Sequence, residues 1–413
     1  MPAHWNLYRR IILFLLLVLA AAAQLRFALQ EQLQFSDNTE RLADVRIRNP
    51  RVMLNFAKQK HLFEADLDTA QRLFRQALIC SPLYVPAWLG LAELFNDRGD
   101  KERAAAIVTY ADSLTRNINR WRWDKTLTAY QLGLTDLLPS ELRYIIAHIP
   151  GKSRVDALNL AFTLWPDPAN LLDQVGTENL LHLFNHAVRT SRPQEALTFW
   201  HHIAQSQIAS DERQAVAFIE MLLRTDHVAE AVPIWRQRFN GQDTIFNSDF
   251  QTRPLGRAFG WRLSDHKGVD QRFEPLPQPG AHAIHLRFKG WENLSYQHLL
   301  QIVPLEPHSD YRFTVQMKSD KLTTDQRPFW EVYGYKCKAS RATSEMAATD
   351  QDWTEHTIDF HVPTDCSAMV VRLRRQESTM LDNKITGRLW IRQPAITAID
   401  LQPFQQPQDR PQQ

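Results

Sequence analysis

The sequence has little glycine, little cysteine and almost no excess of charge of either sign. Only 13 of its 413 residues are glycine, and it contains no glycine-rich phosphate loop, dinucleotide fingerprint, nucleophile elbow or zinc-protease helix. The 48 basic and 46 acidic residues leave a net charge of +2, which is too weak a field to favour nucleic acid as a partner. These absences argue against nucleotide-dependent enzymes and nucleic-acid-binding proteins.

The composition is nevertheless that of a folded chain. Hydrophobic residues make up 44% of the sequence, which is enough for ordinary cores, and the length allows two or three domains. Tryptophan is abundant, with 12 residues. This side chain usually serves the cores of helical repeats or surfaces that stack on flat ligands, and both uses have candidates in this chain.

Residues 1–30 have the pattern of an export segment. Arg9 and Arg10 precede an uncharged run, 11–23, whose last residues are small, as before a signal-peptidase site. This run would rise only about 20 Å as a helix, short of the roughly 30 Å hydrocarbon core, but apolar residues continue to Leu29. Two outcomes stay open: a cleaved signal peptide with a soluble periplasmic product, or an anchor in the inner membrane. The two arginines favour the anchor through the positive-inside rule.

The three cysteines fit an exported chain. Cys80 lies in the N-terminal half, whereas Cys337 and Cys366 both lie in the C-terminal half. A pair within one exported domain is able to form a disulfide, although spacing alone does not establish that the Cα atoms are close enough. The alternative is two buried free thiols.

Residues 45–240 are predicted to form helical hairpins. Apolar residues at spacings of three and four make one stripe, a Gly-Asp pair at 99–100 predicts a turn, and small residues make a second stripe. The second stripe recurs 34 residues earlier in a unit that ends at Pro82. The positions are Trp88, Leu91, Ala92 and Phe95 in the first stripe, Ala104, Val108 and Ala111 in the second, and Ala70, Phe74 and Ala77 in the earlier unit.

This pattern resembles the tetratricopeptide repeat. The resemblance implies stacked helical pairs, about five in all, that form an α-solenoid whose concave surface binds a protein segment. Aromatic residues at helical spacing are expected in the core, so none of them is assigned to a ligand. His182 and His186 would share a helix face but lack an evident third ligand, and no metal or cofactor is predicted.

After residue 240 the pattern changes to short alternating runs bounded by turn residues. Alternation of apolar and polar residues has the period of a strand with one buried face. Several such runs, with no helical pattern between them, predict an antiparallel sandwich over 242–400. The runs are 284–288, 296–303, 311–317, 329–335, 358–362, 369–373 and 389–396.

The start of this region resembles the first strands of jelly-roll carbohydrate-binding modules, the galactose-binding-like sandwiches. Residues 246–250 supply an Asn and two Phe, and 259–261 supply a Gly-Trp pair. The likeness continues along the domain and implies a jelly roll that faces glycan. Its motif positions imply that Trp261, Trp353 and Trp390 are core residues.

These patterns together predict an α + β multidomain chain. It has an N-terminal membrane segment (1–30), an α-solenoid of helical hairpin repeats (45–240) and a C-terminal antiparallel jelly-roll β-sandwich (242–400). The Pro- and Gln-rich tail, 401–413, is expected to be disordered.

The candidate glycan site follows from the same resemblance. Sugar binding in such modules depends on exposed aromatic residues that stack on pyranose rings and on polar groups that reach the hydroxyls. In the run 329–335 the tyrosines share one face and the tryptophan takes the other, so one of these faces is expected in the core. The candidates are Trp291, Trp330, Tyr333 and Tyr335, with Arg375 and Gln376 as polar partners.

Both resemblances are to architectures that act by binding, so no enzymatic activity is predicted. The predicted function is an envelope scaffold in exopolysaccharide or O-antigen assembly or export. Its repeats would hold a protein of the polysaccharide machinery, and its sandwich would face polysaccharide. One alternative is a lectin-like protein with the repeats as a spacer. The other is a glycan-active enzyme whose two carboxylates are distant in the chain.

Overall fold

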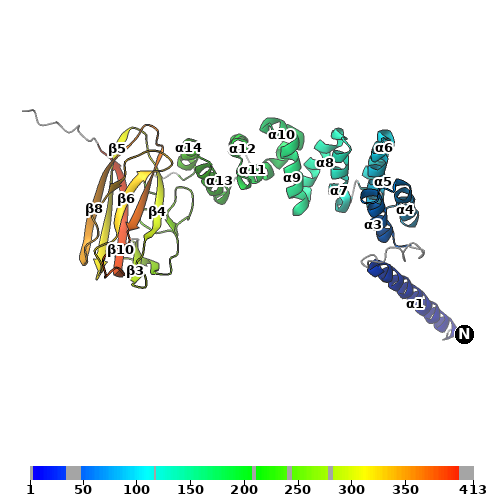
Figure 1. Ribbon diagram of the computed structural model, residues 1–413, viewed down its shortest axis with the longest axis horizontal. Helices are drawn as coiled ribbons and strands as arrows, with labels where there is room; N and C mark the ends of the chain where they lie inside the picture. The colour runs from blue at the N-terminus through cyan, green and yellow to red at the C-terminus, as the bar shows by residue number, and fades with distance from the viewer. Residues whose placement is uncertain are drawn as a thin grey trace, which may run out of the picture. The chain divides into compact units, whose positions relative to one another are not determined.

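The computed structural model describes residues 3–33, 48–115, 118–206, 211–239, 244–277 and 282–399. By its internal contacts the chain divides into two units, Met1–Leu183 and Phe184–Gln413. Figure 1 shows the elements of each unit in chain order. The predicted disordered tail, 401–413, lies outside the described residues.

The first unit begins with a long apolar helix, α1 (Ala3–Leu33). Within it, Ile11–Leu29 is long and apolar enough to cross a membrane, and none of this stretch is buried against other parts of the protein. It is the one helix among the described residues that meets this test. Both an anchor and a signal peptide have this length and composition, so the choice between them stays a prediction.

Helical hairpins follow, and several start with a residue whose side chain caps the helix. Asp66 and Asp167 each accept a hydrogen bond from the backbone N–H three residues on, which satisfies one of the free donors of a helix start. The helices are α3 (Pro50–Leu62), α4 (Leu67–Cys80), α5 (Val85–Asp97), α6 (Lys101–Thr115), α7 (Arg122–Gln131), α8 (Leu138–His148), α9 (Lys152–Leu164), α10 (Pro168–Val175) and α11 (Leu180–Arg189), which ends in the second unit.

The predicted repeat positions lie where these helices pack. Trp88 is half-buried, and its indole N–H donates to the Pro82 carbonyl in the turn between α4 and α5. Gly90 marks the close approach of α4 and α5, because a Cβ there would lie 2.5 Å from the ring of Phe74. The remaining predicted positions are all buried: Ala70, Phe74, Ala77, Leu91, Ala92, Phe95, Ala104, Val108 and Ala111.

A buried ion-pair network joins α6, α7 and α8. Glu141 accepts hydrogen bonds from Arg122 at 3.1 Å and lies 3.0 Å from the Lys125 ammonium, and Lys125 also pairs with Asp112. Removing one partner of a buried pair leaves an uncompensated charge. The network therefore holds these three helices in one arrangement.

The second unit holds the last helices, α12 (Pro193–Gln205), α13 (Glu212–Arg224) and α14 (Val228–Phe239). Phe184, Trp200 and Phe218 pack their rings together, with centroids 5.1 to 5.6 Å apart. The change from helix to strand follows α14, at the predicted position. Because α12 to α14 group with the strands by contact, the domain boundary at 240–242 stays a prediction.

Two antiparallel five-stranded sheets form the sandwich, as predicted (Figure 1). Sheet A has the order β1-β4-β9-β6-β7, and sheet B has the order β2-β3-β10-β5-β8. Six of the seven alternating runs lie wholly in a strand, and the seventh, 329–335, lies in one as far as Gly334. The strands are β1 (Arg262–Leu263), β2 (Val269–Pro275), β3 (His282–Lys289), β4 (Tyr296–Pro304), β5 (Ser309–Asp320), β6 (Phe329–Gly334), β7 (Ala342–Thr343), β8 (Gln351–Val362), β9 (Ala368–Arg375) and β10 (Thr386–Ala398).

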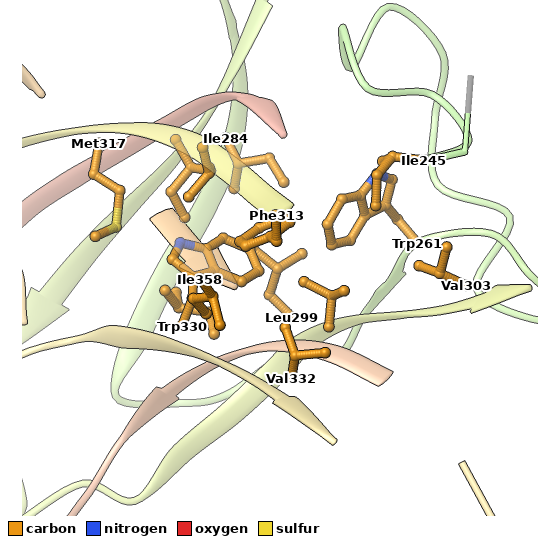
Figure 2. Packing of buried hydrophobic residues seen from close by; sticks show 14 of the residues in the cluster. Ile245, Trp261, Ile284, Leu299, Val303, Phe313, Met317, Trp330, Val332 and Ile358 are labelled. Carbon is orange, nitrogen blue, oxygen red and sulfur yellow. The ribbon is translucent and has the colours of Figure 1, made fainter. Parts of the chain in front are cut away.

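The core lies between the two sheets (Figure 2). Trp330 of β6 is fully buried there, with its ring centroid 6.2 Å from that of Trp261 and 5.3 Å from that of Phe313. Leu299, Val332 and other aliphatic side chains fill the space around them. The prediction that Trp261 is a core residue is confirmed.

The segment 244–261, predicted as the first strands, is instead a series of turns before the short strand β1. The side chain of Asn247 closes one turn, because its amide donates to the Thr252 carbonyl and its oxygen accepts from the Thr252 N–H. Phe250 and Phe259 are buried. This prediction was wrong because buried aromatic residues anchor a loop to the core as effectively as they anchor a strand.

A disulfide joins Cys337, which follows β6, to Cys366, which precedes β9, with 5.5 Å between the Cα atoms. Of the two outcomes left open by the sequence, the structure has the bridge. Cys80 is free and exposed.

Contacts with α13 and α14 cover one end of the sandwich. Glu220 of α13 accepts a hydrogen bond from the Ala258 N–H at 2.6 Å and pairs with Arg262 at 2.8 Å. Arg236 of α14 pairs with Glu306 in the β4–β5 connection at 2.6 Å. We call this the proximal end. The distal end then carries the β3–β4, β5–β6 and β9–β10 connections.

Candidate functional site

The structure corrects two of the six predicted glycan contacts. Trp330 and Arg375 are both 0% exposed, so neither side chain is available to a ligand. Trp330 fills the core because its neighbours on the same face of β6 point between the sheets. In the run 329–335, the face that carries Trp330 is therefore the one that packs in the core.

Arg375 instead fixes the connections at the distal end. Its guanidinium donates to the carbonyls of Leu294, Gln326 and Asn383 and to the side chain of Asn293. These acceptors belong to the β3–β4, β5–β6 and β9–β10 connections, so one buried cation holds all three. Burial lowers the pKa of Arg375, and the carboxylates of Asp325 and Glu377 oppose that shift.

The two predicted tyrosines have partners within the chain. The Tyr335 hydroxyl donates to the carbonyl of Leu223 at 3.1 Å, and burial raises its pKa. Tyr333 is half-buried, with the guanidinium groups of Arg341 and Arg372 at 5.2 Å and 4.8 Å from its ring centroid. Tyr335 is thus part of the junction with α13, and Tyr333 is flanked by cations.

The other two predicted residues lie at the surface. Trp291, in the β3–β4 connection, is 61% exposed, and the Lys289 ammonium lies 4.5 Å from its ring centroid. Gln376, just after β9, is exposed as well. Of the predicted aromatic candidates, Trp291 is the one with a large exposed surface.

The outer face of sheet B adds two tryptophans that the sequence prediction had placed in the core. Trp390 lies between the buried Leu389 and Ile391 of β10, so its indole points to the opposite, outward face. Trp353 of β8 is half-buried on the same face, where the Arg392 guanidinium lies 4.1 Å from its ring centroid. The prediction for both was wrong. The signal that finds Trp390 is the strand alternation itself.

Trp390 is held in place by its neighbours. The ring of His285 stacks on it with 4.6 Å between centroids and 4° between planes, and the indole N–H donates to Glu274 at 3.1 Å. Glu274 also pairs with His285 at 2.7 Å. Burial raises the pKa of Glu274, but the hydrogen bonds from Trp390 and His285 outweigh it, and the net pKa is lowered.

A groove of about 1000 Å³ runs over this face towards the distal end. Outward side chains of β2 and β3 line it, together with Trp291, the end of β5 and the start of β10. A second, smaller depression adjoins it and includes Trp390. Asp320 and Arg388, which form an ion pair, line both. We call the larger depression the sheet-B groove.

The register of sheet B sets two rows of side chains across this face. In the first, Arg287 stands opposite Asp270 on one side and Arg388 on the other. In the second, His285 stands opposite Arg272 and Trp390. The sheet-B groove therefore combines an exposed indole at one end, a fixed indole at its border, and charged groups between them.

Comparisons with known proteins add likenesses of low similarity. No protein-family model matches the chain, and no curated protein matches it. Solved structures that resemble part of it include one titled "CBM4 structure and function" (14% identity, TM-score 0.26, 38% of this chain and 99% of that one). Another is TmCBM61 in complex with β-1,4-galactotriose (17% identity, TM-score 0.28, 38% and 100%). A third is pilF of Pseudomonas aeruginosa (14% identity, TM-score 0.26, 47% and 93%). We draw no function from likenesses at these identities and TM-scores.

Proposed function

We propose that the chain is a non-enzymatic scaffold of the bacterial envelope that binds a saccharide on the outer face of sheet B. The observation that carries this proposal is Trp291, 61% exposed beside a groove of about 1000 Å³ that is lined by charged side chains. Indole rings bind the apolar faces of pyranose rings, and charged and amide groups bind the hydroxyls. The groove offers both kinds of group on one rigid sheet.

The remaining parts of the proposal concern the other segments of the chain. The helical hairpins of 45–240 bind a protein partner, the apolar helix α1 holds the chain at the inner membrane, and the partner belongs to exopolysaccharide or O-antigen assembly or export. The apolar stretch Ile11–Leu29 of α1 is long enough to cross a membrane, which supports the membrane placement. Small residues are buried where the helices of the hairpins pack, which supports the repeat architecture.

Binding rather than catalysis is supported by the state of the groove's carboxylates. A glycosidase needs one carboxylic acid with a raised pKa to protonate the leaving oxygen. The Lys289 ammonium instead holds the pKa of Asp270 below its usual range, and hydrogen bonds lower that of Glu274. Asp320 is engaged by Arg388.

The test is calorimetric titration of the purified full-length chain with a panel of envelope oligosaccharides. We expect saturable binding that is lost in Trp291→Ala and kept in Tyr333→Ala, a matched control because Tyr333 is an aromatic residue on the other sheet. Absence of binding by any oligosaccharide would contradict the saccharide site. Release of reducing ends from any of them would contradict the non-enzymatic proposal.

A further inference from the structure

The charge in the sheet-B groove is unbalanced, although that of the whole chain is not. Five basic and three acidic side chains line the groove. Each acidic one already has a cationic or hydrogen-bonding partner: Asp270 with Lys289, Glu274 with His285 and Trp390, and Asp320 with Arg388. Each carboxylate of the groove is therefore already paired within the protein.

Three of the basic side chains have no such partner. Arg272, Arg287 and Lys321 are exposed and make no ion pair or side-chain hydrogen bond with any described residue. The two arginines stand on outward positions of adjacent strands, in the rows that lead to Trp390 and to Arg388. The surplus positive charge of the groove thus includes two neighbouring guanidinium groups on β2 and β3.

The pairing of Arg287 with Arg388 is the most informative contact. The register places them directly opposite each other on neighbouring strands, where Cβ atoms are about 5 Å apart and like charges are destabilising. Asp320 neutralises Arg388 from the far side. Asp270, opposite Arg287 on β2, attracts Arg287 but forms its ion pair with Lys289, so it neutralises Arg287 only in part. An anion bound between the strands would remove this repulsion.

We infer that the sheet-B groove recognises an acidic saccharide, whose carboxylate is bound by Arg287 and Arg272 while a pyranose ring stacks on Trp291. The planar guanidinium fork matches a carboxylate through two parallel hydrogen bonds, and a uronate carries its carboxylate on the pyranose ring itself. This inference rests on the proposed saccharide site and names the class of sugar for it.

The experiment titrates the full-length chain with oligomers of four uronates (galacturonate, glucuronate, mannuronate and guluronate) and with their carboxyl-reduced, neutral counterparts. At least one uronate oligomer is expected to bind about tenfold or more tightly than its neutral counterpart. Arg287→Gln should abolish that preference without lowering the thermal midpoint, because Arg287 is exposed and its charge stands opposite that of Arg388. Arg312→Gln is the control for position, since it removes the same charge from the same sheet face near the proximal end, where Arg312 is paired with Asp359.

Each outcome decides between the two proposals. Equal binding of acidic and neutral oligomers overturns the acidic preference and leaves the saccharide site standing. Absence of binding by any oligomer overturns both. A preference for sulfated dextran oligosaccharides over every uronate overturns the carboxylate assignment, and an equal loss in Arg287→Gln and Arg312→Gln overturns the role of the groove.

Discussion

The two ends of the β-sandwich carry similar aromatic and basic side chains, but those at one end are bonded within the chain and those at the other end are exposed. At the proximal end, Tyr335 uses its hydroxyl on the Leu223 carbonyl and Lys336 donates to the Arg224 carbonyl at 2.8 Å. At the distal end, Trp291 is 61% exposed, and Arg287 is exposed and makes no ion pair or side-chain hydrogen bond with any described residue. The proximal groups serve the fold, whereas the distal groups are free for a ligand. Residue type alone does not distinguish a structural side chain from a candidate ligand contact. The two are distinguished by whether the side chain already has a hydrogen-bonding partner within the chain.

The largest effect on stability is expected at Trp330, which was predicted as a ligand contact and is core. Trp330→Ala should lower the free energy of unfolding by about 3–5 kcal/mol, because it leaves a cavity between the sheets. Denaturant titration of the full-length chain measures this. A loss smaller than that of Trp291→Ala would contradict the assignment of these two residues to core and surface.

Arg375→Met should have the next largest effect. It leaves several buried carbonyls without a donor, at roughly 2–3 kcal/mol, and it releases the β3–β4 connection that carries Trp291. We expect weaker saccharide binding together with lower stability. Arg374→Met, one residue earlier on β9 and only half-buried, is the control and should leave binding unchanged.

At the proximal end, Glu220→Gln should cost about 1.5 kcal/mol, because the hydrogen bonds from the Ala258 N–H and from Arg262 lose their charged acceptor. Saccharide binding should be unaffected, since Glu220 lies at the end opposite Trp291. Circular dichroism melts and calorimetry on the same sample test both statements. A change in saccharide affinity without a change in melting temperature would contradict the claim that the proximal end serves stability and not binding.

Much of the fold could be predicted because it depends on periodicity. The alternating runs of the sequence form strands, and the small residues Ala70 and Ala77 lie where helices pack. Both could be predicted because burial on one face imposes a period of 2 on a strand and of 3.6 on a helix. The segment 244–261 could not be predicted, since its aromatic residues anchor turns that have no period.

The candidate site was predicted less well, for a different reason. Trp390 and Trp353 were assigned by motif position, although the alternation around Trp390 already points it outward. The role of Arg375 depends on carbonyls from three connections distant in the sequence. No local sequence pattern predicts that these three connections meet at one side chain.

Tyr335→Phe isolates a single contact of the junction. Loss of the hydrogen bond to the Leu223 carbonyl should reduce the free energy of unfolding by about 1 kcal/mol. Since this hydroxyl is bound within the chain, saccharide affinity should not change. A tenfold loss of affinity would instead restore Tyr335 as a ligand contact.

The smallest effect on stability is expected at Trp291, where the comparison between the ends is sharpest. Trp291→Ala removes a side chain that is 61% exposed and has one ring contact, from Lys289, so the free energy of unfolding should change by no more than about 0.5 kcal/mol. Trp291→Tyr should keep part of the saccharide affinity, because a smaller ring still stacks on a pyranose. If Trp291→Ala destabilises the protein as much as Arg375→Met does, the indole serves the distal connections, and its exposure is no evidence for a ligand.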